Sequence, residues 1–469
     1  MNAAEAAILT LYYLVLSVLA VYSVHRFHLV RLRRRSPEPR RVRGSEAPAV
    51  AVQLPLYNEP NVVARLLEAV TRIEYPGALE IQVLDDSTDE TSRIVAAAAA
   101  RDPRIVHIRR DARDGFKAGA LAHGMARSNA ALFAVFDADF VPPPDILLRT
   151  VPYFADPRVG MVQARWTHLN REQSLLTRVQ ALFLDAHFAV ESAARNFGGR
   201  FFNFNGTAGV WRREAIEDAG GWSSSTLTED LDLSYRAQLA GWDFVFVNDV
   251  EVPAELPAGL RGFQDQQHRW AKGSIQTARK VLGGIVTSEL PRATKVEALF
   301  HLTNNAAYLL SVVLALVIVP AMLVRYEHAL AWTFVFDLAL FAASSGSVLL
   351  FYREGQRWAG RAAPSLRELL AVLPVGVGMA VRNASAVIEG TFERGGFFER
   401  TPKAGDGGIA ISSRRRNLRG IAEAALAIFF IGTMIAFAAR GYWTALPFLS
   451  IFASGYASFA LLNIAESAV

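Results

Sequence analysis

The sequence predicts an α/β domain inserted between helices that cross a membrane. Its 469 residues exceed the roughly 250–300 at which one hydrophobic core stops growing, so at least two structural units are expected. The chain is 52% hydrophobic, has a positive mean hydropathy, and carries apolar runs of about 20 residues, enough to span a bilayer, towards both ends. Between these runs, short β-rich segments alternate with segments of helical periodicity. Because cysteine is absent, disulfides, thiolate metal sites and cysteine nucleophiles are excluded.

The first predicted element is a membrane helix over residues 1–25, followed by a basic linker over residues 26–47. The apolar run 6–24 lacks the basic start of a signal peptide. Arginines follow it instead: Arg26, Arg31, Arg33, Arg34, Arg35, Arg40, Arg41 and Arg43. Such a cluster could bind nucleic acid, but its place beside an apolar run favours the positive-inside rule. We therefore expect the amino terminus outside, the linker in the cytosol, and no nucleic-acid partner.

The second predicted element is a soluble domain over residues 48–260. Strands are predicted at residues 49–54, 79–84, 104–108 and 131–136. Helices are predicted at residues 61–72, 88–100 and 117–126. Near-continuous apolar strands that alternate with helices indicate a largely parallel sheet covered on both faces.

Polar side chains follow several of these strands, where each strand ends. In parallel sheets covered by helices, ligands bind beyond the carboxyl ends of the strands, so these side chains are expected at one edge. They are Tyr57 and Glu59 after the first strand, Asp85 and Asp86 after the second, and Asp137 and Asp139 after the fourth. The sequence therefore predicts a polar site at this edge.

The remaining elements are predicted to lie in or on the membrane. The apolar segment 366–388 is interrupted by Pro374, and if it spanned the bilayer the later arginine cluster would lie outside. We therefore place it in the interface or as a re-entrant helix. This gives five spans, with the carboxyl terminus inside, in an inner or plasma membrane. The units are interfacial helices over 261–300, a hairpin over 301–352, an interfacial or re-entrant region over 353–419, and a second hairpin over 420–469.

Asp137 and Asp139 are separated by one residue, which in an extended chain puts both carboxylates on one side, about 6–7 Å apart. Paired carboxylates suit a hard cation such as Mg²⁺ or Mn²⁺, which could bridge the phosphates of a nucleotide sugar. A solvated turn is the alternative interpretation of the same residues. Asp85 and Asp86 close a strand that reads as buried, and hydrogen bonding to a nucleoside is one use for them.

Thr228, Glu229 and Asp230 are predicted to open a helix, with Thr228 as its N-cap. Carboxylates in a first turn are stabilised by the helix dipole, so a purely structural role is the alternative. The same field is expected to keep Asp230 ionised at neutral pH, as a general base for a sugar hydroxyl must be. Glu229 is the adjacent alternative for the base.

Gln266, Arg269 and Trp270 stand at i, i+3 and i+4, so they share one helix face. An arginine fork beside a glutamine amide suits a pyrophosphate leaving group, and an indole suits stacking on a pyranose. An interfacial tryptophan beside an arginine is the structural alternative. His268 points elsewhere on the helix and is predicted to be structural.

In combination, these clusters resemble the family 2 processive glycosyltransferases of the cellulose-synthase superfamily. The matching elements are Asp85-Asp86, Asp137-Ala138-Asp139, Thr228-Glu229-Asp230 and Gln266-Gln267-His268-Arg269-Trp270. Residues 82–89, 115–121 and 202–212 are closest to plant-type mannan synthases and to the glucan synthases of xyloglucan backbones. The resemblance covers residues 50–273.

The resemblance implies a GT-A (Rossmann-like) cytosolic glycosyltransferase domain, inversion at the anomeric carbon, and Mg²⁺ or Mn²⁺ held by Asp137 and Asp139. Asp230 would be the catalytic base. Donor-binding residues would be Tyr57, Glu59, Asp85, Asp86, Lys117, Asp137, Gln266 and Arg269. Acceptor-binding residues would be Trp270, Glu229, Asn205, Gly206 and Thr207. Residues 397–403 lie where family members carry a gating loop.

The predicted function is polymerisation of a β-1,4-linked hexose, as a glucan or a mannan, with the growing polysaccharide as acceptor and the helices as its exit. UDP-glucose and GDP-mannose both remain possible donors, although Asn203 favours the glucan synthases. One alternative is a single sugar addition to a membrane lipid. Another is a non-enzymatic component with a degenerate transferase domain, against which the intact carboxylates argue. The oligomeric state stays open.

Overall fold

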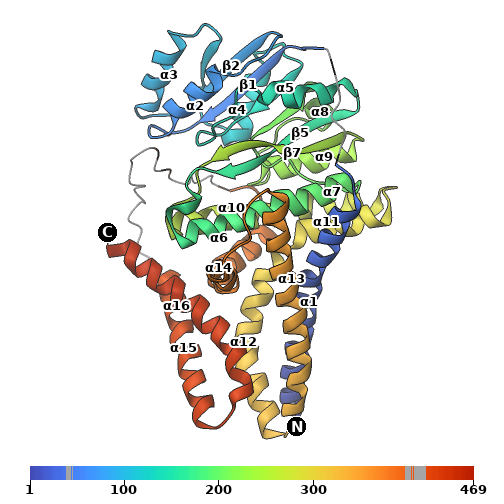
Figure 1. Ribbon diagram of the computed structural model, residues 1–469, viewed down its shortest axis with the longest axis vertical. Coiled ribbons are helices and arrows are strands. Elements are labelled where there is room, and N and C mark those ends of the chain that lie inside the picture. Colours follow the sequence, from blue (N-terminus) through green and yellow to red (C-terminus); the bar gives the residue numbers. More distant parts are fainter. Residues whose placement is uncertain (39–43, 45, 397–402, 404, 406–418, 469) are drawn as a thin grey trace.

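A computed structural model describes the chain except residues 39–43, 45, 397–402, 404, 406–418 and 469. An α/β domain forms one end of the molecule, and long helices descend from it (Figure 1). This is the predicted arrangement of a soluble domain set among apolar helices.

The α/β domain is built on a seven-stranded sheet with the order β3-β2-β1-β4-β6-β5-β7. The four strands predicted from the sequence are confirmed to within two residues at each end. All neighbouring pairs are parallel except those that β6 forms with β4 and β5. The strands are β1 (Val50–Leu56), β2 (Leu79–Asp85), β3 (Ile105–Arg109), β4 (Leu132–Val135), β5 (Val159–His168), β6 (Gly209–Arg212) and β7 (Asp243–Ala254).

Two hydrophobic cores lie on the two faces of this sheet. Val52 and Leu54 of β1 belong to one core, whereas Ala51 belongs to the other, because successive strand residues point to opposite faces. The helices are α2 (Val63–Thr71), α3 (Thr91–Ala99), α4 (Phe116–Met125), α5 (Ile146–Thr150), α6 (Leu175–Ala186), α7 (Ala193–Phe197), α8 (Arg213–Asp218) and α9 (Glu229–Leu239). Shorter helical segments are η1 (Val151–Ala155), η2 (Arg171–Gln173) and the π-helix η3 (His187–Ser192).

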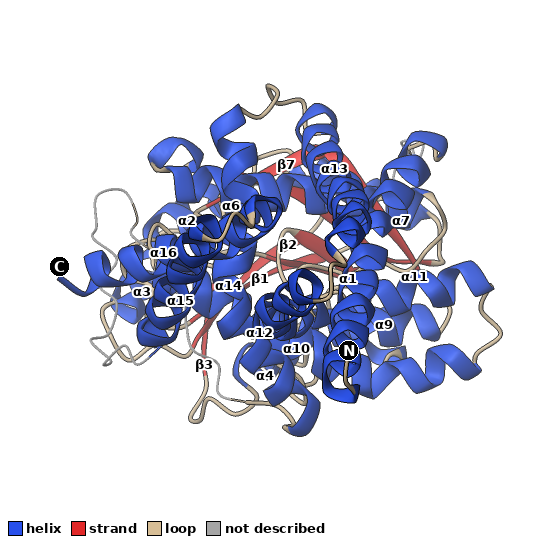
Figure 2. Ribbon diagram, turned by 90° about the horizontal axis from the view of Figure 1, so that it is seen from below, coloured by secondary structure: helices blue, strands red, loops and turns tan. Residues whose placement is uncertain are grey.

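In the part of the chain that the structure describes, eight further helices attach to this domain or descend from it. They are α1 (Ala3–Arg35), α10 (Leu260–Thr287), α11 (Arg292–Thr303), α12 (Ala306–Glu327), α13 (Phe334–Trp358), α14 (Leu366–Phe392), α15 (Arg419–Ala439) and α16 (Leu446–Ala468), with the short turns η4 (Ala331–Thr333) and η5 (Trp443–Ala445). α1 packs against α12 and α13, and this group lies beneath the sheet (Figure 2). α1 continues to Arg35, so the prediction that a linker begins at residue 26 is wrong.

Six helices among the described residues are long and apolar enough to cross a membrane: α1, α12, α13, α14, α15 and α16. The sequence predicted five spans and an interfacial or re-entrant segment at α14. Figure 1 shows α14 end-on while its neighbours are seen along their lengths, so α14 runs crosswise to them. This orientation supports the interfacial placement, which stays a prediction.

Candidate active site

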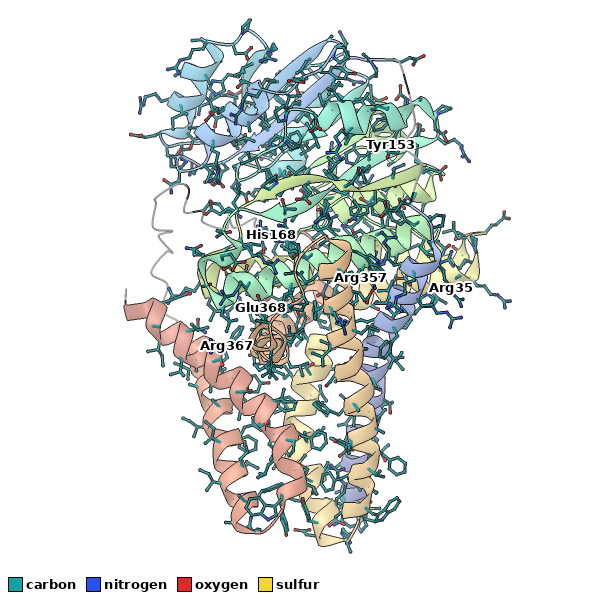
Figure 3. All side chains as sticks on the ribbon, in the orientation of Figure 1. Arg35, Tyr153, His168, Arg357, Arg367 and Glu368 are labelled. Atoms are coloured by element: carbon teal, nitrogen blue, oxygen red, sulfur yellow. The ribbon has the colours of Figure 1, made fainter. Side chains whose placement is uncertain are left out.

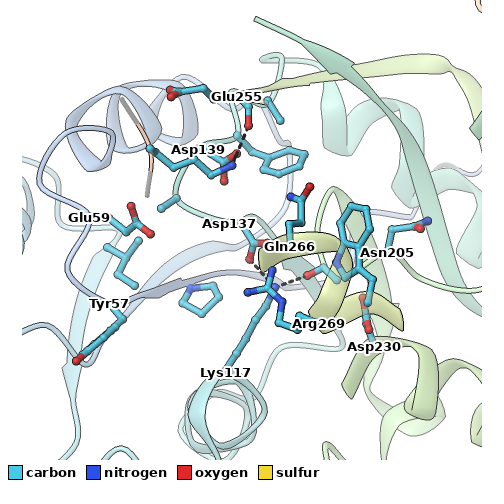
Figure 4. A pocket seen from close by; sticks show the side chains of 18 of the residues that line it. Tyr57, Glu59, Lys117, Asp137, Asp139, Asn205, Asp230, Glu255, Gln266 and Arg269 are labelled. Carbon is cyan, nitrogen blue, oxygen red and sulfur yellow. Dashed lines mark hydrogen bonds and ion pairs between the residues drawn. The ribbon is translucent and has the colours of Figure 1, made fainter. Parts of the chain in front are cut away.

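Nearly all of the predicted site residues line one cleft. It lies beyond the carboxyl ends of the strands, and α9 and α10 contribute residues to its lining, among them Asp230 and Arg269 (Figure 4). The predicted residues that line it are Tyr57, Glu59, Asp86, Lys117, Asp137, Asp139, Asn205, Gly206, Glu229, Asp230, Gln266, Arg269 and Trp270. Side chains far apart in the sequence therefore share one cavity, which was the geometric basis of the prediction.

Asp137 occupies the centre of the cleft, directly beyond β4. Its backbone N–H donates to the Thr207 hydroxyl at 2.9 Å, which fixes the turn. Lys117 Nζ, on the first turn of α4, lies 2.5 Å from Asp137 Oδ1 and donates to the Gly206 carbonyl at 2.8 Å. Burial alone would lower the Lys117 pKa, but the charges of Asp137 and Glu229 outweigh it and raise the pKa. Lys117 is thus a fixed positive charge in the middle of the cleft.

Asp139 lies beside Asp137 and also holds a cationic group. The Lys403 ammonium donates to Asp139 Oδ2 and to the Glu255 carbonyl, both at 2.8 Å (Figure 4). The predicted gating segment 397–403 otherwise falls outside the residues that the structure describes. Its last residue therefore reaches into the cleft, at the carboxylate assigned to a metal.

The carboxylates of Asp137 and Asp139 fit a divalent cation by their chemistry. Each offers hard oxygen ligands within the cleft, and each already holds a lysine ammonium at contact distance. No cluster of three or more possible metal ligands occurs among the described residues, so the protein would supply two carboxylates and a substrate the remaining ligands. That is the usual pattern for Mg²⁺ bound with phosphates.

Glu229 and Asp230 form the first turn of α9 and face Lys117 across the cleft. Thr228 stands at the N-cap, but its side chain contacts Thr277 at 3.3 Å and does not cap the helix. The expectation that the helix dipole keeps Asp230 well ionised at neutral pH is wrong. Burial, and then the charge of Glu229, raise the pKa of Asp230 to about 7, because desolvation outweighs the dipole. A carboxyl with this pKa is poised to exchange a proton near neutrality.

α10 carries Gln266, Arg269 and Trp270 along one side of the cleft, as their spacing predicted. Burial lowers the pKa of Arg269, although the carboxylates around it act in the opposite direction. His268 instead lies 3.4 Å from Glu389 of α14, which agrees with the structural role predicted for it. Lys272, one turn further along, pairs with Glu389 at 3.1 Å. α14 therefore holds the helix that carries the arginine and the tryptophan.

Two predicted site residues do not line the cleft. Asp85 is buried, and its carboxylate accepts hydrogen bonds from Ser87 N–H at 2.9 Å and Ser92 Oγ at 2.6 Å and contacts His107 Nε2 at 2.8 Å. Thr207 is buried behind Asp137. In this structure both side chains stabilise the turns that present their neighbours, so the contacts of Asp85 with the donor and of Thr207 with the acceptor stay predictions.

The cleft also contains side chains that the sequence reasoning missed. They include Arg113, His168, Glu255 and Trp166. Glu255 follows β7 and Trp166 and His168 lie at the end of β5, so the carboxyl-end rule would have found them had those strands been predicted. Arg113 lies in the loop that leads to Lys117, so its closeness to Lys117 in the sequence could have indicated that it lines the same cleft.

The comparisons with known proteins agree with this geometry. Residues 48–273 match the family model described as "Glycosyltransferase like family 2". The chain carries a family 2 glycosyltransferase domain. The resemblance on which the sequence analysis depended is thereby confirmed for the soluble part of the chain.

Curated proteins similar to this domain include plant enzymes. Probable glucomannan 4-beta-mannosyltransferase 15 of Arabidopsis thaliana is 45% identical over 249 residues, which cover 51% of this chain and 46% of the relative. Glucomannan 4-beta-mannosyltransferase 1 of Cyamopsis tetragonoloba is 38% identical over 299 residues, covering 61% and 57%. The chain thus spans about half the length of the curated relatives it matches.

A solved structure supports the fold. The mannosyltransferase of Pyrobaculum calidifontis, in complex with GDP-Man and Mn²⁺, superposes with a TM-score of 0.56. It is 21% identical and covers 82% of this chain and 99% of its own. The predicted GT-A class of the family 2 domain is thus confirmed.

Proposed function

We propose that the protein is a membrane-embedded inverting hexosyltransferase that extends a β-1,4-linked mannan or glucomannan from GDP-mannose. The observation that carries this is the convergence of Asp137, Asp230 and Arg269 in one cleft of a family 2 domain. The mannosyltransferase names of the relatives favour GDP-mannose over UDP-glucose, against the indication that Asn203 gave.

The residues of the cleft suffice for a single displacement. The Asp230 carboxylate accepts the proton of the acceptor hydroxyl, and the freed oxygen attacks the anomeric carbon from the side opposite the diphosphate. Lys117 and Arg269 stabilise the negative charge that develops on the leaving diphosphate. Because one displacement inverts the anomeric carbon, an α-linked donor gives a β-linked product, and no covalent nucleophile is needed.

Asp137 and Asp139 would hold Mg²⁺ or Mn²⁺ at the diphosphate. The cation would supply further charge neutralisation to the leaving group. Trp270, at the same cleft, offers an apolar face for a sugar ring of the acceptor. The acceptor would therefore enter between α10 and Asp230.

We infer that this cleft faces the cytosol and that the amino terminus lies outside. Arg35 at the end of α1 and Arg357 at the end of α13 lie where the helices meet the α/β domain (Figure 3). The positive-inside rule assigns that side of the membrane to the cytosol. A nucleotide sugar would then reach the cleft directly, and the polymer would leave through the helices.

The experiment incubates the purified full chain, in lipid vesicles, with GDP-[¹⁴C]mannose or UDP-[¹⁴C]glucose and Mg²⁺ or Mn²⁺. We expect GDP release together with a long product that a β-mannanase degrades. A single sugar on extractable lipid would replace this proposal with glycolipid synthesis. Failure to release nucleoside diphosphate from either donor would overturn transferase activity altogether.

The raised pKa of Asp230 predicts a pH dependence. Since the base acts as the carboxylate, kcat/KM is expected to fall about tenfold per pH unit well below pH 7 and to level off above it. Glu229→Gln removes the second cause of the shift, so it should move the midpoint to lower pH. A pH series of initial rates checks both statements, and an unmoved midpoint would contradict the assigned cause.

Gly206 faces Asp230 so closely that any side chain there should disturb the base. A Cβ would lie 2.8 Å from Asp230 Oδ2, and the φ of +83° is itself unfavourable for alanine. We expect Gly206→Ala to lower kcat by at least about tenfold. Gly199→Ala is the matched control, because Gly199 has a φ of +66° and nothing within 4 Å of its Cβ position. Equal losses of kcat in both variants would show that backbone strain alone is responsible.

A further inference from the structure

Arg113 is a cleft residue whose charged group has no polar partner among the residues that the structure describes. Its guanidinium lies over the ring of Tyr57, 3.4 Å from the ring centre, and 5.2 Å from the ring centre of Phe116. The side chain is partly exposed to the cleft. The ring of Tyr57 holds the guanidinium flat and leaves its N–H groups available to a ligand.

The neighbouring arginines, unlike Arg113, donate hydrogen bonds to carboxylates or carbonyls. Arg104 is tied to Asp102, Arg109 donates to a carbonyl, and Arg110 binds both oxygens of Asp86. Because Arg110 neutralises Asp86, that carboxylate does not draw Arg113 out of the cleft. Among the described residues, the Arg113 guanidinium is thus held by the rings of Tyr57 and Phe116 and makes no hydrogen bond to a carboxylate or carbonyl.

The position of Arg113 within the cleft identifies the part of the donor that it meets. Tyr57 lies on one side of Asp137, and Asn205 and Asp230 lie on the other (Figure 4). In the proposed reaction the diphosphate binds at Asp137 and the sugar is transferred at Asp230. The end marked by Tyr57 and Arg113 is then left for the nucleoside.

A flat arginine fork distinguishes nucleobases by their hydrogen-bonding edges. Guanine presents two adjacent acceptors, O6 and N7, and arginine pairs with both. Adenine offers N7 beside an amino donor, and the two acceptors of uracil, O4 and O2, are separated by the N3–H donor, so neither base can accept both hydrogen bonds of the fork. We infer that Arg113 selects a guanosine donor by donating two hydrogen bonds to O6 and N7 of the base. This inference rests on the proposed function, since it assumes that the cleft binds a nucleotide sugar.

The test measures binding and needs no turnover. Titration calorimetry on the detergent-purified full chain with Mn²⁺ compares GDP, UDP, ADP, IDP and 7-deaza-GDP. IDP keeps O6 and N7 and should bind like GDP, whereas UDP, ADP and 7-deaza-GDP should bind about 10- to 100-fold more weakly. The 7-deaza compound removes one acceptor atom and involves no substitution in the protein, so misfolding cannot explain its result.

Variants then assign the selectivity to Arg113. Arg113→Ala should bind GDP about 10- to 100-fold more weakly than the wild type does, and its affinity for UDP should change little. Its affinity for 7-deaza-GDP should fall only by the contribution of the one hydrogen bond, to O6, that this compound still accepts. Arg113→Lys keeps the charge but lacks the fork, so it should not restore the preference for GDP. Arg93→Ala, an exposed arginine of α3, is the matched control and should bind every nucleotide like the wild type.

Several results would overturn the inference. One is an equal loss for GDP and UDP in Arg113→Ala, which would show that Arg113 binds phosphate or ribose. A second is restored GDP affinity in Arg113→Lys. A third is a wild-type protein that binds 7-deaza-GDP or UDP as tightly as GDP. The inference and the proposed function can fail independently. A chain that selects GDP through Arg113 but makes no polymer would refute only the proposed polymerisation.

Discussion

Asp230→Asn is expected to lower the rate of sugar transfer by about 10²- to 10⁴-fold, the usual contribution of a positioned general base. The asparagine keeps the size of the side chain but cannot accept the proton of the acceptor hydroxyl. The variant should still fold, because burial and the charge of Glu229 already oppose ionisation of Asp230, so a neutral group relieves an unfavourable charge. Initial rates with GDP-[¹⁴C]mannose measure the loss.

Two further measurements separate a lost base from a damaged cleft. GDP affinity should remain near that of the wild type, since Asp230 lies on the side of Asp137 away from Tyr57 (Figure 4), where the acceptor is proposed to bind. Asp243→Asn is the matched control, because Asp243 is an exposed carboxylate at the start of β7, at the end of that strand away from the cleft. Substantial transfer by Asp230→Asn would remove Asp230 from its role and make Glu229 the candidate base.

The sheet and the position of its site could be predicted from the sequence for a physical reason. Buried parallel strands are continuous apolar runs, and the carboxyl ends of such strands share one edge. Tyr57 after β1 and Asp137 after β4 were therefore brought together by a rule that uses only strand position. The same rule would have placed Glu255, had β7 been predicted.

The choice between Asp85 and Asp86 could not be made from the sequence. Successive residues of a strand point to opposite sides, so only one of two adjacent carboxylates faces the cleft. Which one depends on how β2 pairs, and Asp85, the last residue of β2, aligns with Leu56 and Arg109. Its side chain reaches His107 and Ser92 instead of the cleft. Sequence spacing carries no information on this register.

The charge state of Asp230 could not be predicted from the sequence either. The start of a helix is visible in the residues, and its dipole favours an ionised carboxylate. Burial depends on what packs against the start of the helix, which here is α10. Because desolvation exceeds a dipole effect of about 0.3–1 kcal/mol, the expectation based on the dipole alone was wrong.

Arg269→Ala is expected to lower kcat by about 10²- to 10³-fold, comparable to the loss of one charge-stabilising donor from an active site. In the proposed reaction Arg269 donates to the diphosphate as its bond to the sugar breaks. Arg269→Lys should recover only part of this loss, since an ammonium keeps the charge but not the paired donors of the guanidinium. Steady-state rates over a range of GDP-mannose concentrations separate kcat from KM.

We expect the effect on kcat to come from loss of the guanidinium and not from movement of α10, because other residues of α10 hold it against α14. The ion pair between Lys272 and Glu389 does not involve Arg269, so the helix should keep its place in the variants. Arg158→Ala, at an exposed arginine of the α/β domain, is the control for loss of a positive charge. If Arg269→Ala raised KM and left kcat unchanged, the guanidinium would bind the donor equally in the ground state and the transition state. It would then have no part in stabilising the leaving group.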